Sequence, residues 1–270
     1  MSLTPRAGQD GLARVRALGH GPRRGLMLHC SLAHGGAWRG LAGAFEAEFT
    51  FAAPDLPSHG RSAVWDRQGS YHDACTAAAA AHLTVLPDDQ PIDIVGHSFG
   101  ATVALRLAVE RPDRVRSLVL IEPVLFAVAV ADDPNFVSNM NGLRDILARE
   151  GRRAATKAFL QEWGGGLPWE KMPEATRADM AGRIEVIPDA APALYQDEAG
   201  LLAEGRLQAL DMPVLLIRGA ASPAVVETIH SGLIRRIFGA EGAVIAGAGH
   251  MLPISHPKDC AAVMGRFWGV

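Results

Sequence analysis

The segment Gly96-His97-Ser98-Phe99-Gly100 carries the clearest chemical signal in this chain. It lies between the apolar runs 91–95 and 101–105, an order that predicts a strand, a tight turn and a helix. The two glycines permit a strained backbone at the serine, because a Cβ at either position would collide with the neighbouring chain. Ser98 would stand at the head of the helix, where the helix dipole and the free N–H groups favour negative charge on an attacked carbonyl. The pattern therefore predicts that Ser98 is a nucleophile.

The rest of the chain alternates short apolar strands with helical patterns, which is typical of a mostly parallel α/β sheet flanked by helices. The stretch Ala13–Gly19 is a candidate antiparallel edge strand. We expect the other strands at Arg24–His29, Phe49–Pro54, Ile92–Gly96, Ser117–Glu122, Val214–Gly219 and Gly242–Ala246. We expect helices near Trp38–Glu48, Tyr71–Leu86, Gly100–Glu110, Ala224–Phe238 and Lys258–Trp268.

One interval, residues 126–210, breaks this alternation. It contains no Val/Ile-rich strand but several amphipathic stretches, among them Asn141–Glu150, Arg152–Gln161 and Glu174–Ile184. The glycines 164–166 and the prolines, including those at 188 and 192, are expected to stop helices and set turns. We expect a helical lid (126–210) over the carboxyl edge of the sheet, inserted after the sixth strand, and a core formed by residues 1–125 and 211–270.

Composition narrows the function classes. The 270 residues are 49% hydrophobic, enough for a large core, and no linker is evident. The formal net charge of −3, with scattered Lys and Arg, argues against a nucleic-acid partner. Cys30, Cys75 and Cys260 lack the spacing of a zinc site or a disulfide framework, so we expect buried thiols and no metal. Without a signal-like segment or an apolar run of membrane length, a cytoplasmic protein with no membrane partner is expected. The oligomeric state cannot be read from the sequence.

Four segments together resemble the α/β-hydrolase fold family, in its lidded, cofactor-independent branch. They are His29-Cys30-Ser31, the run Asp55-Leu56-Pro57-Ser58-His59-Gly60-Arg61-Ser62, the segment around Ser98, and Gly247-Ala248-Gly249-His250-Met251-Leu252-Pro253. The resemblance covers nearly the whole chain outside the lid. It implies a serine hydrolase that needs no cofactor and acts on a small molecule.

Serine needs a base to take its proton during attack, and His250 is the candidate. It follows the last expected strand in a glycine-rich turn, and a histidine late in the chain agrees with the family order. The usual family position for the orienting acid, after the strand Val214–Gly219, holds Ser222 instead of a carboxylate. Some family members carry the acid one strand earlier, where this chain has Glu122 at the end of an apolar strand. We favour Glu122 as the third catalytic residue, and a dyad assisted by Ser222 stays open.

The resemblance also implies an oxyanion hole made of two backbone N–H groups, those of Phe99 and Ser31. Here Cys30 replaces the glycine of the usual His-Gly pair, and this cysteine narrows the backbone choices of the turn. We interpret Cys30 as a buried, inert thiol rather than a second nucleophile.

A serine nucleophile argues against the family branches that use aspartate, the haloalkane dehalogenases and epoxide hydrolases. We therefore expect a carboxylic-ester hydrolase that forms an acyl-serine intermediate on a small to medium, mainly apolar substrate. Candidate pocket residues in the lid are Phe126, Phe136, Met140, Trp163, Trp169 and Tyr195.

Several alternatives remain open on the same motifs. A C–C bond hydrolase, an enol-lactonase or a cofactor-free perhydrolase would share nearly all of them. An arginine clamp formed by Arg144, Arg152 or Arg153 would favour an acidic substrate. The serine at position 222 and the cysteine at position 30 also leave room for a ligand-binding sensor with low turnover.

Overall fold

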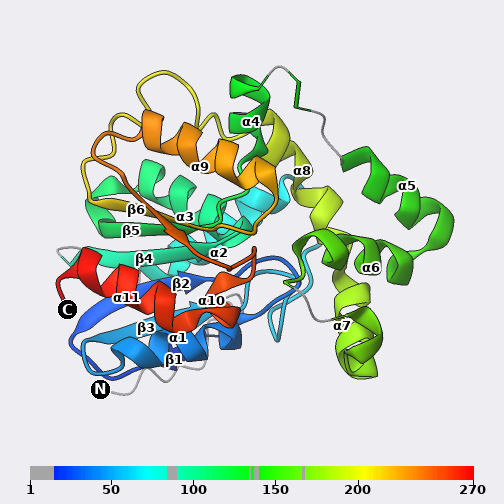
Figure 1. The fold of residues 1–270 in the computed structure, drawn as a ribbon, viewed down its shortest axis with the longest axis horizontal. Helices are drawn as coiled ribbons and strands as arrows, with labels where there is room; N and C mark the ends of the chain where they lie inside the picture. Colours follow the sequence, from blue (N-terminus) through cyan, green and yellow to red (C-terminus); the bar gives the residue numbers. More distant parts are fainter. Residues whose placement is uncertain (1–14, 84–89, 134, 137–139, 166–167) are drawn as a thin grey trace.

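A computed structural model describes residues 15–83, 90–133, 135–136, 140–165 and 168–270. Figure 1 shows a central sheet with helices on both sides and a group of helices beyond one end of it. The strands are β1 (Val15–Leu18), β2 (Arg23–Leu28), β3 (Phe49–Pro54), β4 (Ile92–His97), β5 (Val115–Ile121), β6 (Val214–Gly219) and β7 (Glu241–Ile245). Their spatial order is β1-β3-β2-β4-β5-β6-β7. All neighbours are parallel except β1 and β3, so the expected antiparallel edge strand is confirmed.

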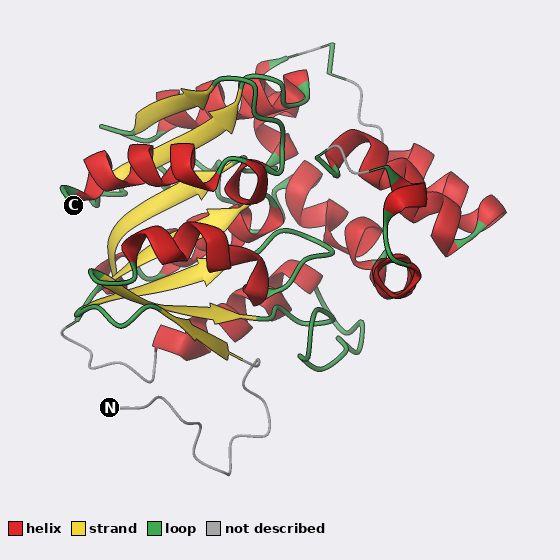
Figure 2. Ribbon diagram, turned by 60° about the horizontal axis from the view of Figure 1, so that its bottom comes forward, coloured by secondary structure: helices red, strands yellow, loops and turns green. Residues whose placement is uncertain are grey.

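The inner strands are buried on both faces because their apolar side chains alternate between two cores, whereas the edge strands β1 and β7 are mainly exposed or half-buried. On β4, for example, Ile94 belongs to one core and Val95 to the other. The first core is covered by α2 (Tyr71–Leu83), α3 (Phe99–Glu110), α4 (Phe126–Asp132), α8 (Val186–Gln196) and α9 (Ala224–Arg236). The second is covered by α1 (Arg39–Ala42), α10 (Leu252–Ser255) and α11 (Pro257–Trp268). Figure 2 shows the sheet between these two helix layers.

The helix expected near Trp38–Glu48 is broken in the structure. The segment forms a 3-10 turn η1 (Gly35–Trp38), the single-turn α1 and a second 3-10 turn η2 (Gly43–Phe45). Gly40 and Gly43 lie inside it, and glycine is a poor former of a helix interior. Burial of Trp38 and Phe45 in the second core stabilises these short turns instead.

The interval after β5 is helical, as expected. It contains α4, α5 (Met140–Glu150), α6 (Arg152–Trp163), the 3-10 turn η4 (Trp169–Lys171), α7 (Glu174–Arg183) and α8. In the described residues five strands, β1 to β5, precede these helices. The insertion therefore follows the fifth described strand and not the sixth, which was the position expected from the sequence. In Figure 1, α5, α6 and α7 stand to one side of the sheet, whereas α4 and α8 lie against α9 and α2.

The prolines of α8 do not stop it, contrary to expectation. Pro188 occupies the first turn, where a backbone N–H has no helical partner to lose. Pro192 lies inside the helix and cannot donate to the carbonyl of Pro188. The guanidinium of Arg144 donates to that carbonyl over 3.1 Å, so a side chain from α5 replaces the missing helical bond.

Candidate active site

Ser98 lies at the sharp turn between β4 and α3. Its backbone has φ 56° and ψ −119°, a strained conformation for a residue with a side chain. A Cβ on Gly96 would lie 2.4 Å from the carbonyl oxygen of Gly100, and a Cβ on Gly100 would lie 2.3 Å from that of Leu28. Only glycine therefore fits at either position. The turn places the Ser98 side chain at the carboxyl edge of the sheet, at the N-terminus of α3.

His250 reaches Ser98 from the loop after β7. Its Nε2 is 2.9 Å from the Ser98 Oγ, within hydrogen-bond distance, although 152 positions separate the two residues. Both side chains are buried. The structure thus brings together the two residues that the sequence proposed as nucleophile and base.

Glu122 completes the chain of hydrogen bonds. His250 Nδ1 lies 2.9 Å from its Oε2, and the side chain of Glu122 is fully buried. Its backbone follows β5 directly with φ 51°, a left-handed conformation that is rare outside glycine. Such strain at a buried acid is typical of functional positions.

Ser222 supports the carboxylate of Glu122. Its hydroxyl donates to Glu122 Oε1 over 2.7 Å, and the N–H of Gly219 donates to the same oxygen over 2.6 Å. Because β5 and β6 are neighbours, a carboxylate at the end of β5 lies beside the turn after β6 where the family's acid was expected. Ser222 therefore occupies the usual position of the family's acid and donates a hydrogen bond to the carboxylate of Glu122, which follows the neighbouring strand β5.

His250 is also held by its backbone and by the helical segment. The ring Nε2 of His97 lies 2.8 Å from the carbonyl oxygen of His250 and donates to it. Burial lowers the pKa of His97 to about 3, so this ring is a neutral donor. The indole of Trp163, on α6, packs edge-on against the His250 ring with centroids 4.7 Å apart.

Two buried histidines shape the loop that contains Ser31. The N–H of Leu32 donates to His59 Nε2 over 2.9 Å, and the N–H of Leu56 donates to His29 Nε2 over 2.9 Å. Both rings must accept at Nε2, and burial lowers both pKa values, that of His29 to about 4. The neutral rings fix this loop against the turn that follows β3.

The two proposed oxyanion donors flank Ser98. Phe99 opens α3, so its N–H has no partner within the helix. Ser31 lines the same space as Ser98. Cys30, which precedes Ser31 in the loop, is a free buried thiol, and burial raises its pKa to about 12. Such a thiol is a poor nucleophile, in agreement with the interpretation from the sequence.

Two cavities meet at Ser98. The histidine-side cavity, about 490 Å³, is lined by His250 and Met251 and by residues of α7 such as Thr176 and Met180. The aromatic cavity, about 350 Å³, is lined by Phe126, Phe136, Leu194 and Tyr195 among others. Ser31, Ser98, Phe159 and Trp163 line both.

The expected pocket aromatics separate into two groups. Phe126, Phe136 and Tyr195 form one stacked group, with Phe126 and Tyr195 centroids 4.4 Å apart, and Trp163 meets Phe126 edge-on. All four line the aromatic cavity. The side chain of Met140 lies outside the described residues. Trp169 lines neither cavity, and instead lies beside the guanidinium groups of Arg153 and Arg177.

Phe159 is a pocket residue that the sequence analysis missed. It lies on α6, four residues before Trp163, and contributes to both cavities. A spacing of four residues places side chains on the same helix face, which was the available signal.

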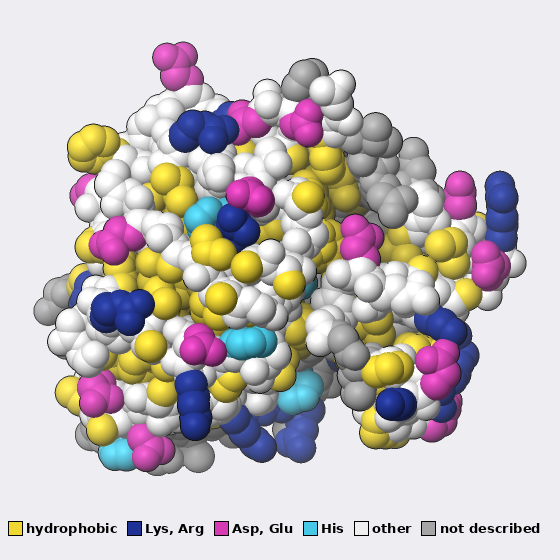
Figure 3. Space-filling view, viewed as in Figure 1, with side chains coloured by type: hydrophobic (Ala, Val, Ile, Leu, Met, Phe, Trp, Pro, Cys, Tyr) yellow, Lys and Arg dark blue, Asp and Glu magenta, His cyan; other side chains and the backbone are white. Residues whose placement is uncertain are grey.

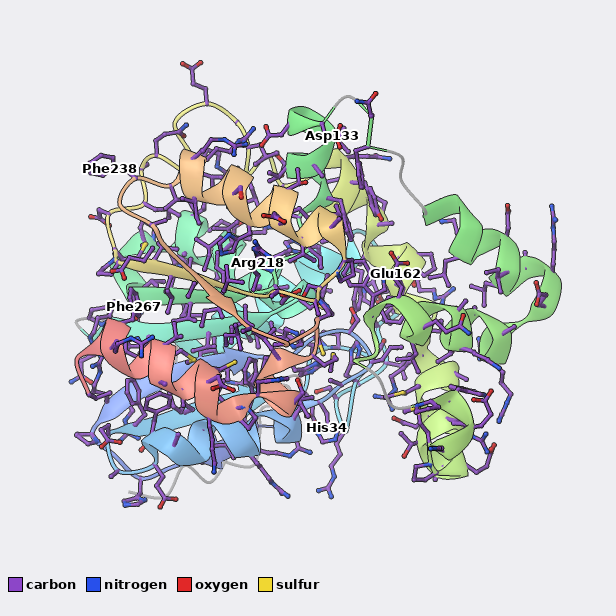
Figure 4. The ribbon with its side chains drawn as sticks, in the orientation of Figure 1. His34, Asp133, Glu162, Arg218, Phe238 and Phe267 are labelled. Atoms are coloured by element: carbon purple, nitrogen blue, oxygen red, sulfur yellow. The ribbon has the colours of Figure 1, made fainter. Side chains whose placement is uncertain are left out.

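Charged residues are sparse at the site. Glu162, on α6, is the one charged side chain among the described residues that line the aromatic cavity. Figure 4 labels it and His34, which lines the histidine-side cavity. Among the described residues, no cluster of three His, Cys, Asp or Glu side chains could hold a metal ion.

The three lid arginines considered as a substrate clamp line neither cavity. Arg144 bonds to α8, Arg152 pairs with Glu185, and Arg153 pairs with Glu174. Figure 3 shows positive and negative side chains side by side on the outer edge of α6 and α7. The arginines instead hold the helical segment together. They therefore give no support to the alternative in which an arginine clamp binds an acidic substrate.

The comparisons with known proteins agree with this architecture. A family model described as alpha/beta hydrolase fold matches residues 26–257. Lipase LipV of Mycobacterium tuberculosis is 32% identical over 254 residues, which cover 90% of this chain and 92% of that protein. The pimeloyl-(acyl-carrier protein) methyl ester esterase of Nitrosospira multiformis is 27% identical, covering 94% of this chain and 97% of its own.

Solved structures share the fold. The enol-lactonase from Burkholderia xenovorans has a TM-score of 0.72 at 16% identity, covering 95% of this chain and 96% of its own. A thermophilic esterase from Thermogutta terrifontis has a TM-score of 0.70 at 21% identity, covering 94% and 92%. At such identities the likeness concerns the fold alone.

Proposed function

The chain belongs to the alpha/beta hydrolase fold family and is a carboxylic-ester hydrolase, and we propose that it cleaves small to medium, mainly apolar esters through an acyl-serine intermediate on Ser98. The observation that carries this proposal is the continuous hydrogen-bonded chain Ser98–His250–Glu122. The lid role of residues 126–210 is part of the proposal, and contact between Trp163 and His250 supports it.

In the first half of the reaction, Ser98 Oγ attacks the ester carbonyl carbon while its proton passes to His250 Nε2. The carboxylate of Glu122 stabilises the resulting imidazolium through His250 Nδ1. The backbone N–H groups of Phe99 and Ser31 donate to the carbonyl oxygen as it becomes negative. The C–O bond to the alcohol then breaks, and His250 returns the proton to the leaving oxygen.

In the second half, water takes the place of the alcohol. His250 accepts a proton from this water as its oxygen attacks the acyl-serine carbonyl. Collapse of the second tetrahedral intermediate releases the acid and returns the proton to Ser98. Among the described residues, the walls of the cavities are mainly apolar, which favours an apolar substrate.

The direct test is hydrolysis of a short-chain p-nitrophenyl ester by the wild type and by Ser98→Ala. We expect steady turnover by the wild type and a loss of roughly five to six orders of magnitude in kcat for the variant. Ser231→Ala, a serine on α9 that lines neither cavity, is the matched control and should keep wild-type turnover.

Two outcomes would contradict the proposal. Wild-type rates in Ser98→Ala would exclude the acyl-serine. A single burst of nitrophenol without turnover, or tight small-molecule binding without any release, would instead indicate a sensor.

A further inference from the structure

We propose that the two cavities divide the substrate, so that the alcohol of the ester occupies the histidine-side cavity and the acyl group occupies the aromatic cavity. This inference rests on the proposed function, because it assumes an ester bound at Ser98. It goes further by stating which residues select each half of the substrate. It starts from the finding that both cavities open onto Ser98 and Ser31.

The first argument is the path of the proton. When the ester bond breaks, the alkoxide oxygen must receive the proton that His250 Nε2 took from Ser98. A proton donor must lie within hydrogen-bond reach of the atom that it protonates. His250 lines only one of the two cavities, so the leaving oxygen and the group attached to it belong on that side.

The second argument is the direction left for the acyl chain. The attacked carbon carries the Ser98 oxygen, the oxyanion, the leaving oxygen and the acyl carbon in a tetrahedral arrangement. The oxyanion lies toward the N–H groups of Phe99 and Ser31, and the leaving oxygen lies toward His250. The acyl chain therefore extends away from His250, into the cavity lined by the Phe126, Phe136 and Tyr195 rings.

The side chains that line each cavity suit the half of the substrate assigned to it. The stacked rings of Phe126 and Tyr195 give the aromatic cavity rigid, flat walls for a medium-sized apolar acyl chain. The histidine-side cavity is larger, about 490 Å³ against about 350 Å³, and includes three methionines, Met172, Met180 and Met251. Methionine side chains adapt to irregular apolar groups. We therefore expect this enzyme to accept alcohols much larger than methanol.

Phe159 and Trp163 separate the alcohol group of the ester from its acyl group. Both lie on one face of α6 and line both cavities, so they stand above Ser98 where the cavities meet. The ring of Trp163 makes T-shaped contacts with both His250, which lines the histidine-side cavity, and Phe126, which lines the aromatic cavity. The two halves of the substrate then pass on opposite sides of this pair.

The test uses two matched substitutions at exposed alanines. Ala175 on α7 lines only the histidine-side cavity, and Ala224 at the start of α9 lines only the aromatic cavity. Ala175→Trp and Ala224→Trp each put the same indole into one cavity. Because both positions are exposed, neither change forces a large ring into the packed core.

Each variant is measured with three esters, and acid release gives kcat/KM. The alcohol ratio compares octyl butanoate with ethyl butanoate, and the acyl ratio compares ethyl octanoate with ethyl butanoate. Both ratios are internal to one protein sample, so a partly misfolded variant does not distort them. We expect Ala175→Trp to lower the alcohol ratio about tenfold and Ala224→Trp to lower the acyl ratio about tenfold, each with little effect on the other ratio.

The opposite pattern, with Ala175→Trp changing the acyl ratio, would overturn the assignment. So would equal changes in both ratios, or no change in either. These results are distinct from a failure of the proposed function, in which the wild type would hydrolyse none of the three esters or Ser98→Ala would hydrolyse them at the wild-type rate.

Discussion

The carboxylate of Glu122 is fully buried, and three donors converge on it: His250 Nδ1, the Ser222 hydroxyl and the N–H of Gly219. A buried charge is costly unless it is paired and hydrogen-bonded, and these donors meet that need. One oxygen faces the imidazole while the other is held by β6 and the turn after it. The acid is therefore oriented before any substrate binds.

Glu122→Gln tests the role of this charge. The amide keeps the size of the side chain but cannot stabilise an imidazolium, and it can hold the histidine in the wrong tautomer. We expect kcat for a p-nitrophenyl ester to fall about 10⁴-fold, as it does when other catalytic triads lose their carboxylate. Circular dichroism should show that the fold persists.

The matched control is Glu227→Gln, which removes an exposed carboxylate on α9 that pairs with Arg218 on β6. Its kcat should stay near the wild-type value. If Glu122→Gln kept wild-type kcat in a folded protein, Glu122 would not be the orienting acid and a dyad would be the better description.

At the scale of elements, the close approach of α3 to β2 sets the position of Ser98. Gly100 is the second residue of α3, and it faces the carbonyl oxygens of Leu28 and His29 at the end of β2. Backbone atoms within a central strand cannot shift cheaply. The glycine is thus a packing requirement that also fixes the position of Ser98.

Gly100→Ala should show this requirement. Its new Cβ would lie 2.3 Å from the Leu28 oxygen, so the strand or the helix must move. We expect urea unfolding to report a loss of at least about 2 kcal/mol, together with reduced kcat.

Gly182→Ala on α7 is the comparison, because a Cβ there meets nothing within 4 Å. It should leave stability unchanged or raise it by up to about 1 kcal/mol, since alanine favours helix. Equal stability of the two variants would show that the predicted clash at Gly100 is relieved at no cost.

At the scale of the whole molecule, several histidines are buried in the neutral state. Burial lowers the pKa of His29 and of His72 to about 4 and that of His97 to about 3. In the unfolded chain a histidine has a pKa of about 6.5. Below that value the unfolded chain binds more protons than the folded one, so stability must fall as the pH falls.

This predicts marked acid sensitivity between about pH 6.5 and 4. At pH 5 each of these histidines lowers the free energy of unfolding by about 2 kcal/mol relative to its value at neutral pH. Urea unfolding at pH 7.5 and at pH 5 measures the difference. In His72→Gln the difference should shrink by about 2 kcal/mol, whatever the variant's stability at pH 7.5.

His20→Gln, at an exposed position, serves as the control and should keep the wild-type difference. A protein equally stable at pH 7.5 and pH 5 would contradict the neutral, buried state of these rings.

The sequence alone determined the alternating strands and helices, the helical interval after β5 and the family, because these depend on local patterns of apolar residues and glycines. It also proposed Ser98 and His250 from turn motifs. For the broken helix near Trp38, Gly40 and Gly43 were a local signal that the prediction did not use. The continuous α8 was not predictable, since the bond from Arg144 to the Pro188 carbonyl comes from a distant part of the chain.

Only the tertiary structure showed that Glu122 and Ser222 meet beside His250, where the hydroxyl of Ser222 donates to the carboxylate of Glu122. The sequence separates them by 100 residues, but adjacent parallel strands bring the end of β5 beside the turn after β6. The two cavities and the place of Phe159 between them likewise arise from packing of the helical segment over the sheet edge. Local patterns specify elements, whereas the pairing of strands and the docking of helices specify which distant side chains meet.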